Sequence, residues 1–396
     1  MKITRVEDFH VDGGWDTWSF LKVSTDEGVT GWAEFSEERA RLGLTAVVRR
    51  LSQQVVGEDP REVGRITAKL RTMTLGSAGG LQALAIGAFE NALLDIKARA
   101  LGVPVYELFG GAIRKRLPLY WSHCAMYRAK CPDIFEKIIG QPAVLTLDDV
   151  MQAGRMVAEA GFRALKTNRL LLDPARLNGG PPQVARGTGP IELNIEPWMI
   201  RDIEAQMEAL RDGAGPGVAL MLDLNFNYKT EGFRKIALAL ERFDLQWLEM
   251  DSHYPAALAE IRRSTRTPIA SLETILGRRA LRPFIEPPCV DVAIVDVVFN
   301  GLAESVRMAA LLETFELNVA AHNTFSQLGT AISAHFCAAI PNFRIMEIDV
   351  DEVPWRRNLV TRPLRIESGE LLLDDAPGWG MEINEEVARE HAVQRD

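Results

Sequence analysis

The sequence predicts an α/β protein in which a smaller α+β domain precedes a barrel of eight parallel strands. Apolar runs of strand length recur with helical patterns between them, which is typical of a parallel sheet. The polar residues that close successive runs from position 223 to position 347 lie 23 to 26 residues apart, close to the length of one strand with its helix and loops. The first 115 residues lack this period and are expected to form a separate unit.

Residues 1–115 are predicted to form the α+β domain. Two stretches, MKITRVEDFHV and SFLKVSTDEGVTGWAE, alternate apolar and polar residues, and the second contains a turn at residues 26–28; this pattern is typical of half-exposed strands and a hairpin. Helical patterns follow near 41–56 and 60–73. The strongly apolar stretch 81–102 predicts a longer helix, which Gly102 and Pro104 end.

Residues 116–365 are predicted to form the barrel. The strand candidates are 117–124, 162–168, 218–225, 245–251, 268–273, 291–297, 318–323 and 343–349. Strands that are buried on both faces are continuously apolar, and several of these runs show that pattern. Eight such strands that alternate with helices predict a closed barrel.

Three further segments do not follow the regular period. The connections 125–147 and 169–197 follow the first two strands and are too long for a plain barrel. Because they leave the carboxyl ends of strands, where barrels hold their active sites, we expect them to be lids; a solvated insertion or an oligomer contact is the alternative. The last segment, 366–396, has a hairpin pattern around Gly369 and is expected to return to the N-terminal domain.

The composition argues against several classes of partner. A net charge of −9, a pI near 5.4 and the lack of a basic run argue against nucleic acid. No apolar stretch approaches the ~20 residues of a membrane span, so no membrane partner is expected. The first ten residues show no signal-peptide pattern, and the four cysteines form no CxxC pair. We therefore expect a cytoplasmic protein with reduced thiols.

Three carboxylates, Asp223, Glu249 and Glu273, close three successive strand candidates. The carboxyl ends of neighbouring barrel strands meet at one mouth, so these side chains are expected in one sector of it. Clustered carboxylates repel one another unless a cation lies between them, and all-oxygen ligation suits Mg²⁺. The sequence thus predicts a Mg²⁺ site; for any one of the three alone, a surface charge paired with Lys or Arg is the alternative.

The next strand candidates end in residues suited to proton transfer. Asp296 and His322 close the sixth and seventh strands, and a carboxylate beside a histidine fixes the ring tautomer and raises its basicity. Lys166, on the second strand, is expected to act as a base or to bind a substrate carboxylate. Glu347, on the eighth, is expected to interact with a developing oxyanion. With a divalent metal, this set suits removal of a proton α to a carboxylate.

Two other strand-end residues are candidates for lining the site. Asn225 follows Asp223 by two residues, so both side chains point to the same face of the strand, and Asn225 could support the metal or the substrate. His123 ends the first strand candidate and either lines the site or packs in the core.

Taken together, these residues resemble the mandelate racemase subgroup of the enolase superfamily, over nearly the whole chain. The segment AFENALLDIKARALGVPVYELFGG resembles the helix-and-turn signature of the family. The motifs GFRALKTN, MLDLN, WLEMD, SLE, IVDVVFNG and AAHNTFSQLGTAISAH follow in family order and spacing. The resemblance implies a modified TIM barrel, (β/α)7β, with a capping domain and bound Mg²⁺. It implies Asp223, Glu249 and Glu273 as metal ligands and His322 with Asp296 as the acid/base dyad.

Departures from the family pattern narrow the expected activity. Lys166 matches the first lysine of the Lys-X-Lys motif, but Asn168 replaces the second. A two-base racemase needs a proton-transfer group on each face of the substrate, and an amide cannot transfer protons. The resemblance thus implies a dehydratase that converts a sugar acid, an aldonate or aldarate, through an enediolate into a 2-keto-3-deoxy sugar acid. A cycloisomerase or epimerase of the same superfamily and a non-catalytic binding protein are the alternatives.

The resemblance also implies substrate-binding positions outside the barrel strands. Trp15, Trp18 and Thr74 match places where relatives cover the substrate, and ordinary packing is the alternative for each. Asn168 is expected to bind substrate as well. Relatives are often symmetric, so a homo-oligomer is expected, although no sequence feature independently indicates one.

Overall fold

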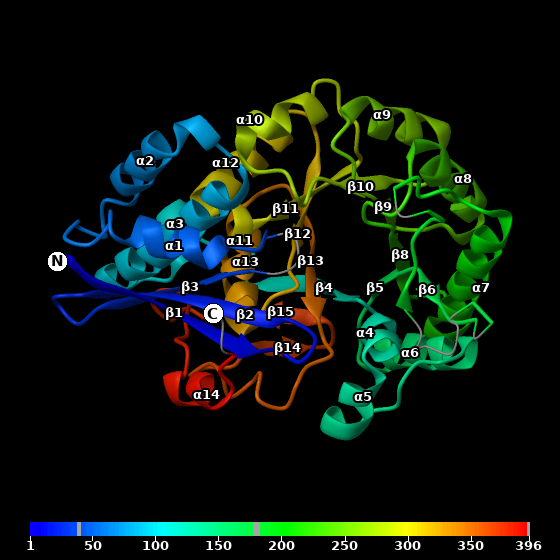
Figure 1. Cartoon of the computed structure of the whole chain (residues 1–396), viewed down its shortest axis with the longest axis horizontal. Helices are drawn as coiled ribbons and strands as arrows, with labels where there is room; N and C mark the ends of the chain where they lie inside the picture. The colour runs from blue at the N-terminus through cyan, green and yellow to red at the C-terminus, as the bar shows by residue number, and fades with distance from the viewer. Residues whose placement is uncertain (38–40, 174, 177–182, 190, 394–396) are drawn as a thin grey trace.

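The computed structural model describes residues 1–37, 41–173, 175–176, 183–189 and 191–393. Its N-terminal part is an antiparallel sheet of β1 (Ile3–Asp12), β2 (Thr17–Thr25) and β3 (Thr30–Phe35), joined in that order. Three helices follow, α1 (Leu44–Ser52), α2 (Val63–Met73) and α3 (Gly80–Leu101). Figure 1 shows this unit, in blue and cyan, beside the barrel. The predicted capping sheet and its helices are confirmed.

Helix α3 connects the two parts of the molecule. It is buried along most of its length, as its apolar sequence predicts, and it contacts both β3 and a short barrel helix, α11 (Val297–Asn300). A Cβ at Gly31 would lie 2.2 Å from the carbonyl oxygen of Ala92. Only glycine therefore allows β3 and α3 to approach this closely.

The second part is a closed barrel of eight parallel strands. They are β4 (Arg116–Ser122), β5 (Ala164–Asn168), β8 (Ala219–Asp223), β9 (Trp247–Glu249), β10 (Ile269–Ser271), β11 (Val292–Asp296), β12 (Asn318–His322) and β13 (Phe343–Asp349). Neighbours pair in this order, and β13 pairs with β4 to close the barrel. All eight predicted strands are present, so the predicted fold class is confirmed.

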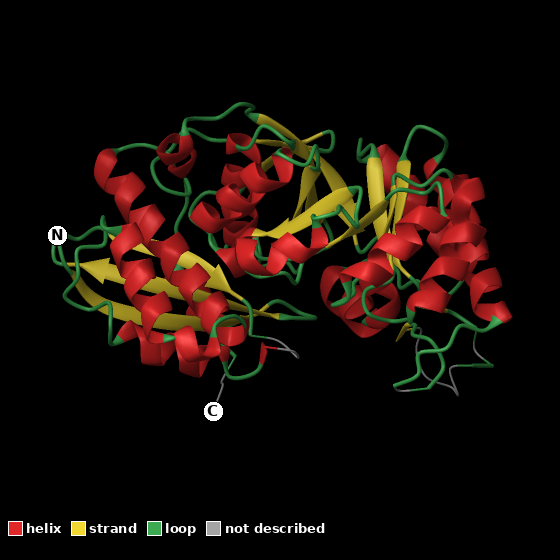
Figure 2. Ribbon diagram, turned by 90° about the horizontal axis from the view of Figure 1, so that it is seen from above, coloured by secondary structure: helices red, strands yellow, loops and turns green. Residues whose placement is uncertain are grey.

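Helices cover the outside of the barrel, as Figure 2 shows from above. They are α6 (Leu147–Glu159), α7 (Pro197–Ala214), α8 (Thr230–Leu240), α9 (Pro255–Ser264), α10 (Gly277–Leu281), α12 (Leu302–Glu313) and α13 (Gln327–Ala339). Inside the barrel, buried side chains that include Tyr120, Met221, Trp247 and Ile294 form a separate apolar cluster. This cluster fills the barrel interior, as in other barrels of this size.

The end of the chain departs from the sequence prediction in one respect. The hairpin of β14 (Arg365–Glu367) and β15 (Glu370–Leu372) pairs with barrel strand β4, antiparallel, and not with the N-terminal domain. This hairpin follows β13 where a further barrel helix would otherwise stand. The chain beyond the hairpin does reach the N-terminal sheet, where Trp379 donates to the carbonyl of Trp32 at 2.9 Å and Val393 to that of His10 at 2.9 Å. The boundaries 115/116 and 365/366 stay a prediction.

The two long connections carry some regular structure. The first contains α4 (Met126–Lys130), α5 (Pro132–Ile134) and a turn of π-helix at Phe135–Ile139. The second forms a two-stranded ribbon of β6 (Leu170–Leu171) and β7 (Gln183–Val184); the stretch 177–182 lies outside the described residues. No helix within the described ranges is long and apolar enough to cross a membrane.

Candidate active site

The carboxyl ends of the barrel strands bring the predicted site residues together at one mouth. Parallel strands in a closed barrel place these ends on one face. Three residues just beyond strand ends have left-handed backbones, with φ of +50° at His123, +46° at Asn225 and +96° at Leu272. Such conformations are uncommon for non-glycine residues and concentrate at functional sites. They occur here where β4, β8 and β10 enter the mouth.

Lys166 lies at the centre of this mouth. Its Nζ is 2.9 Å from Glu347, 3.1 Å from Glu249 and 3.5 Å from Asp223. The side chain is only 2% exposed. Burial alone would lower the pKa of Lys166, but the charges of Glu249 and Glu347 outweigh it and raise the pKa well above its ordinary value. Lys166 is therefore a fixed cation, whereas its sequence pattern also allowed a base.

Further carboxyl groups surround this cation. Burial raises the pKa of Glu249 and of Glu273, and the charge of Asp223 adds to both increases. A fourth acid, Asp251, is buried beside them, and its pKa is raised well above the ordinary value by burial and by the charges of Glu273, Asp223 and Glu249. Sequence reasoning missed Asp251; its position two residues after Glu249, on the same face of the strand, was the available signal.

The donor set fits a hard cation by its chemistry. All the clustered groups are carboxylates, the ligands that Mg²⁺ prefers, and their mutual repulsion favours added positive charge. Oε1 of Glu249 is buried without a hydrogen-bond partner, while its Oε2 accepts from Lys166 and from Nε1 of Trp247 at 3.0 Å. Within the described ranges, no three His, Cys, Asp or Glu side chains converge as metal ligands do. The cation between these carboxylates in this structure is the Lys166 ammonium.

The predicted dyad of Asp296 and His322 is assembled. Nδ1 of His322 lies 2.6 Å from Oδ2 of Asp296, and Nε2 lies 3.6 Å from Glu273. The other Asp296 oxygen accepts from the backbone of Phe299 at 2.7 Å, which fixes the carboxylate. Burial would lower the pKa of His322, but Glu273 and Asp296 outweigh it and raise that pKa to about 10.

Glu347 is an ionised carboxylate with several donors. It accepts from Ser122 Oγ at 2.5 Å and from the backbone of Asn323 at 2.9 Å, in addition to its contact with Lys166. Although burial opposes ionisation, the charges of Lys166 and His322 hold the pKa of Glu347 far below its usual range. The group can accept hydrogen bonds but does not supply a proton.

The amides form a separate small network. Nδ2 of Asn168 donates to Oδ1 of Asn225 at 3.2 Å and to the carbonyl of Asp223 at 3.2 Å. The backbone of Asn225 in turn donates to Oδ1 of Asp223 at 2.8 Å. These two residues therefore position Asp223 and its carboxylate.

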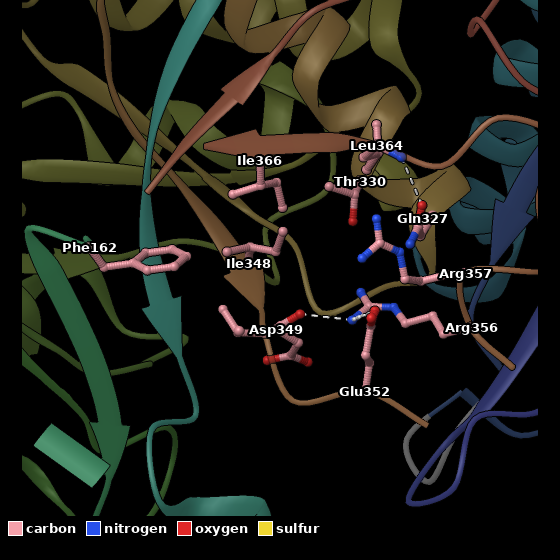
Figure 3. A pocket seen from close by; sticks show the side chains of 11 residues that line it. Phe162, Gln327, Thr330, Ile348, Asp349, Glu352, Arg356, Arg357, Leu364 and Ile366 are labelled. Carbon is pink, nitrogen blue, oxygen red and sulfur yellow. Dashed lines mark hydrogen bonds and ion pairs between the residues drawn. The ribbon is translucent and has the colours of Figure 1, made fainter. Parts of the chain in front are cut away.

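His123 forms a second histidine–carboxylate pair that sequence reasoning did not find. Its Nδ1 lies 2.7 Å from Oδ1 of Asp349, and Tyr127 donates to the other oxygen at 3.2 Å. Arg356 donates to the carbonyl of Asp349 at 2.8 Å, as Figure 3 shows. The cavity drawn there, about 200 Å³, is lined by Asp349, Arg356 and nine other residues, none of which is a predicted site residue.

The N-terminal domain reaches the barrel loops. Trp15 stacks on Tyr127 at 4.5 Å and on Phe135 at 5.4 Å between ring centroids, so it packs against the first long connection. Trp18 is 8% exposed, and its ring lies 5.8 Å from the guanidinium of Arg356.

Thr74 lines a different cavity, of about 560 Å³, between the N-terminal domain and the barrel. Phe299 lines the same cavity, and its ring lies 5.9 Å from that of His322. Of the three predicted capping residues, Thr74 is therefore the one that lines a cavity beside the dyad.

Comparisons with known proteins agree with this architecture. The family described as enolase C-terminal domain-like matches residues 148–387. The mandelate racemase/muconate lactonizing enzyme N-terminal domain matches residues 14–110. The chain belongs to the enolase superfamily, in the mandelate racemase/muconate lactonizing enzyme subgroup. The resemblance seen in the sequence is thus confirmed.

Members of this superfamily similar to the chain have different names. A D-xylonate dehydratase from Haloferax volcanii is 28% identical, over 99% of this chain and 89% of the relative. A D-galactonate dehydratase from Variovorax paradoxus is 27% identical, over 98% and 93%. A crystal structure from Burkholderia xenovorans, provisionally named an L-alanine-DL-glutamate epimerase and bound to magnesium and fumarate, is 42% identical with a TM-score of 0.94, over 99% and 96%.

Proposed function

We propose that this enolase-superfamily enzyme is a Mg²⁺-dependent dehydratase that converts a sugar acid, an aldonate or aldarate, into a 2-keto-3-deoxy sugar acid. The observation that carries the proposal is the asymmetry of the barrel mouth. His322 with Asp296 forms a dyad able to take a proton, whereas Lys166 is held within 3.5 Å of three carboxylates. Return of a proton to the opposite face of the same carbon would need a second base, and the strand of Lys166 does not provide one; elimination needs a single base together with an acid for the leaving group.

Asp223, Glu249 and Glu273 are the residues that would hold Mg²⁺. When bound, the ion would neutralise the substrate carboxylate and stabilise negative charge that develops on it. The raised pKa values of Glu249 and Glu273 fit carboxylates that need an additional positive charge. The magnesium in the 42% identical relative supports the same choice of metal.

Side chains of the protein itself carry out proton removal, stabilise the intermediate and exclude water. His322, its tautomer set by Asp296, removes the α-proton at Nε2 once its ring is neutral. The charge of Glu273 helps to raise the pKa of His322 in this structure, so a cation held by Glu273 would lower that pKa and favour the neutral ring. Lys166 stabilises the resulting enediolate as a fixed positive charge, while Asn168 and Asn225 hold Asp223 in place. The apolar floor beneath the mouth, which includes Trp247 and Tyr120, excludes water from below. Water exclusion strengthens each of these electrostatic interactions.

An epimerase is the second candidate, because the 42% identical structure carries that provisional name. Its fumarate is a small dicarboxylate, which suits a small acid substrate for either reaction. The two candidates share α-proton removal and differ in the second step. An epimerase returns a proton to the opposite face of the same carbon, and the product has the mass of the substrate.

A screen of sugar acids with Mg²⁺ tests the proposal. We expect one acid to yield a 2-keto acid, and both EDTA and the His322→Asn substitution to abolish its formation. Mass spectrometry of the products in D₂O separates the candidates. A deuterated isomer of unchanged carbon skeleton, without loss of water, would replace the dehydratase with the epimerase.

A further inference from the structure

The proposed dehydration needs an acid as well as a base, and this inference rests on that proposed function. Once His322 has taken the α-proton, the β-hydroxyl must leave as water, because hydroxide is a poor leaving group. General acids contribute about 10²- to 10⁴-fold to such steps. His322 carries the α-proton at that moment. A separate residue that donates a proton to the β-hydroxyl is therefore the simplest mechanism.

Several residues at the mouth do not suit this role. The ammonium of Lys166 is bound to three carboxylates within 3.5 Å and is thus directed away from a leaving group. Asn168 and Asn225 are amides and cannot transfer protons. Glu347 stays ionised.

His123 has the properties that the others lack. It follows β4, the strand that lies between β13 and β5 in the barrel, and therefore stands beside the strands of Glu347 and Lys166. Its Nδ1 is bound to Asp349, which leaves Nε2 without a hydrogen-bond partner among the described residues. The side chain is 13% exposed, and its left-handed backbone is a local strain of the kind found at functional sites.

The surroundings of His123 also favour the protonated ring. Burial would lower its pKa, but the charge and hydrogen bond of Asp349, together with Glu347, outweigh burial and raise the pKa above its ordinary value. Asp349 is itself held by Tyr127 and Arg356. Tyr127 stacks on Trp15 of the N-terminal domain, so the capping domain supports the orientation of this pair.

We propose that His123, oriented by Asp349, is the general acid that protonates the departing β-hydroxyl. The α C–H bond breaks with its proton going to His322, and the electron pair moves into the carboxylate to give the enediolate. That pair then forms the C2–C3 double bond as the C3–O bond breaks and Nε2 of His123 gives its proton to the hydroxyl, which leaves as water. The enol becomes the ketone when His322 returns its proton to C3 and the enol hydroxyl proton restores His123. The sum is one sugar acid converted to one 2-keto-3-deoxy acid and one water.

The test separates proton removal from elimination with the His123→Gln variant. Glutamine keeps hydrogen-bonding capacity but cannot donate an acidic proton. We expect 2-keto acid formation to fall by about 10²- to 10⁴-fold, while the α-hydrogen of the recovered substrate still exchanges with deuterium in D₂O. A substrate analogue with fluoride in place of the β-hydroxyl needs less acid assistance, so the variant should release fluoride at close to the wild-type rate.

Two other variants complete the experiment. Tyr127→Phe removes one hydrogen bond to Asp349 and is expected to slow elimination several-fold with exchange unchanged, as a positioning role requires. His391→Gln, the same chemical change on the C-terminal segment, should leave both rates at wild-type values. Equal loss of exchange and elimination in His123→Gln, or no rescue with the fluoro analogue, would overturn the acid role of His123 but not the proposed dehydratase function. If the wild-type protein neither exchanges nor dehydrates any sugar acid, the proposed dehydratase itself fails, and the acid role with it.

Discussion

Replacement of Lys166 by methionine tests the electrostatic structure of the barrel mouth without knowledge of the substrate. Methionine fills a similar volume but removes the ammonium that contacts Glu347, Glu249 and Asp223 at 2.9 to 3.5 Å. The loss of one partner from a buried ion pair costs about 3 to 5 kcal/mol. We expect the metal-free variant to lose about that much of its free energy of unfolding at pH 8.

The pH dependence of this loss follows from the carboxylates. Burial already raises the folded-state pKa values of Glu249 and Glu273, and the charge of Lys166 opposes this increase. Without Lys166 both values rise further, so the folded state binds more protons as the pH falls. The deficit should therefore shrink between pH 8 and pH 5. Urea denaturation in EDTA, followed by tryptophan fluorescence at both pH values, measures this difference in the free energy of unfolding between the variant and the wild type.

Two variants control the Lys166→Met experiment. Lys137→Met makes the same substitution on a surface lysine paired with exposed Asp133 and should cost less than about 1 kcal/mol. Adding Glu249→Gln to Lys166→Met removes one of the repelling charges and should recover part of the loss. A deficit below about 1 kcal/mol at pH 8, or one that does not change with pH, would refute the interpretation of Lys166 as the cation that balances this cluster.

Three further outcomes are expected. Mg²⁺ at 100 times its dissociation constant should raise the free energy of unfolding by about 2.7 kcal/mol, and Glu249→Gln should abolish this increase in a thermal-shift titration. His322→Asn should retain the Mg²⁺ shift but lose deuterium exchange at the α-carbon, as observed by NMR. Burial lowers the pKa of His335 to about 3, below its unfolded value. The stability that depends on neutral His335 is therefore complete above about pH 6.5 and is lost as the pH falls towards 3, by about 5 kcal/mol in total. His335→Gln should flatten the unfolding free energy across that window.

The grouping of the residues at the strand ends could be predicted from the sequence. In a closed barrel, residues that recur at a regular interval along the chain come to lie around one mouth. Each unit of 23 to 26 residues returns the chain to the same face, so Asp223, Glu249 and Glu273 had to be neighbours once the period was recognised. The same reasoning placed Asp296 beside His322. Local patterns decided these contacts, since only adjacent strands are involved.

Other contacts depend on how the barrel closes, which no local pattern records. Asp349 meets His123 because β13 pairs with β4 in a register that sets Asp349 opposite Ser122, across 226 residues of chain. The sequence around Gly369 predicts a hairpin, but its pairing with β4 depends on the space left where no further barrel helix follows β13. The position of Lys166 among three carboxylates likewise depends on side chains from three other strands.

Strand β13 therefore links the parts of the site that the sequence treats separately. Its Glu347 contacts Lys166 and accepts from the backbone next to His322, while Asp349, two residues later, binds His123. Alternation along a strand sends both carboxylates to the mouth, so one short segment orients groups on both of its neighbouring strands. Because β13 also closes the barrel, any change that shifts its register against β4 would separate His123 from Asp349 and Ser122 from Glu347 together. Closure of the barrel and assembly of the site are thus the same structural event.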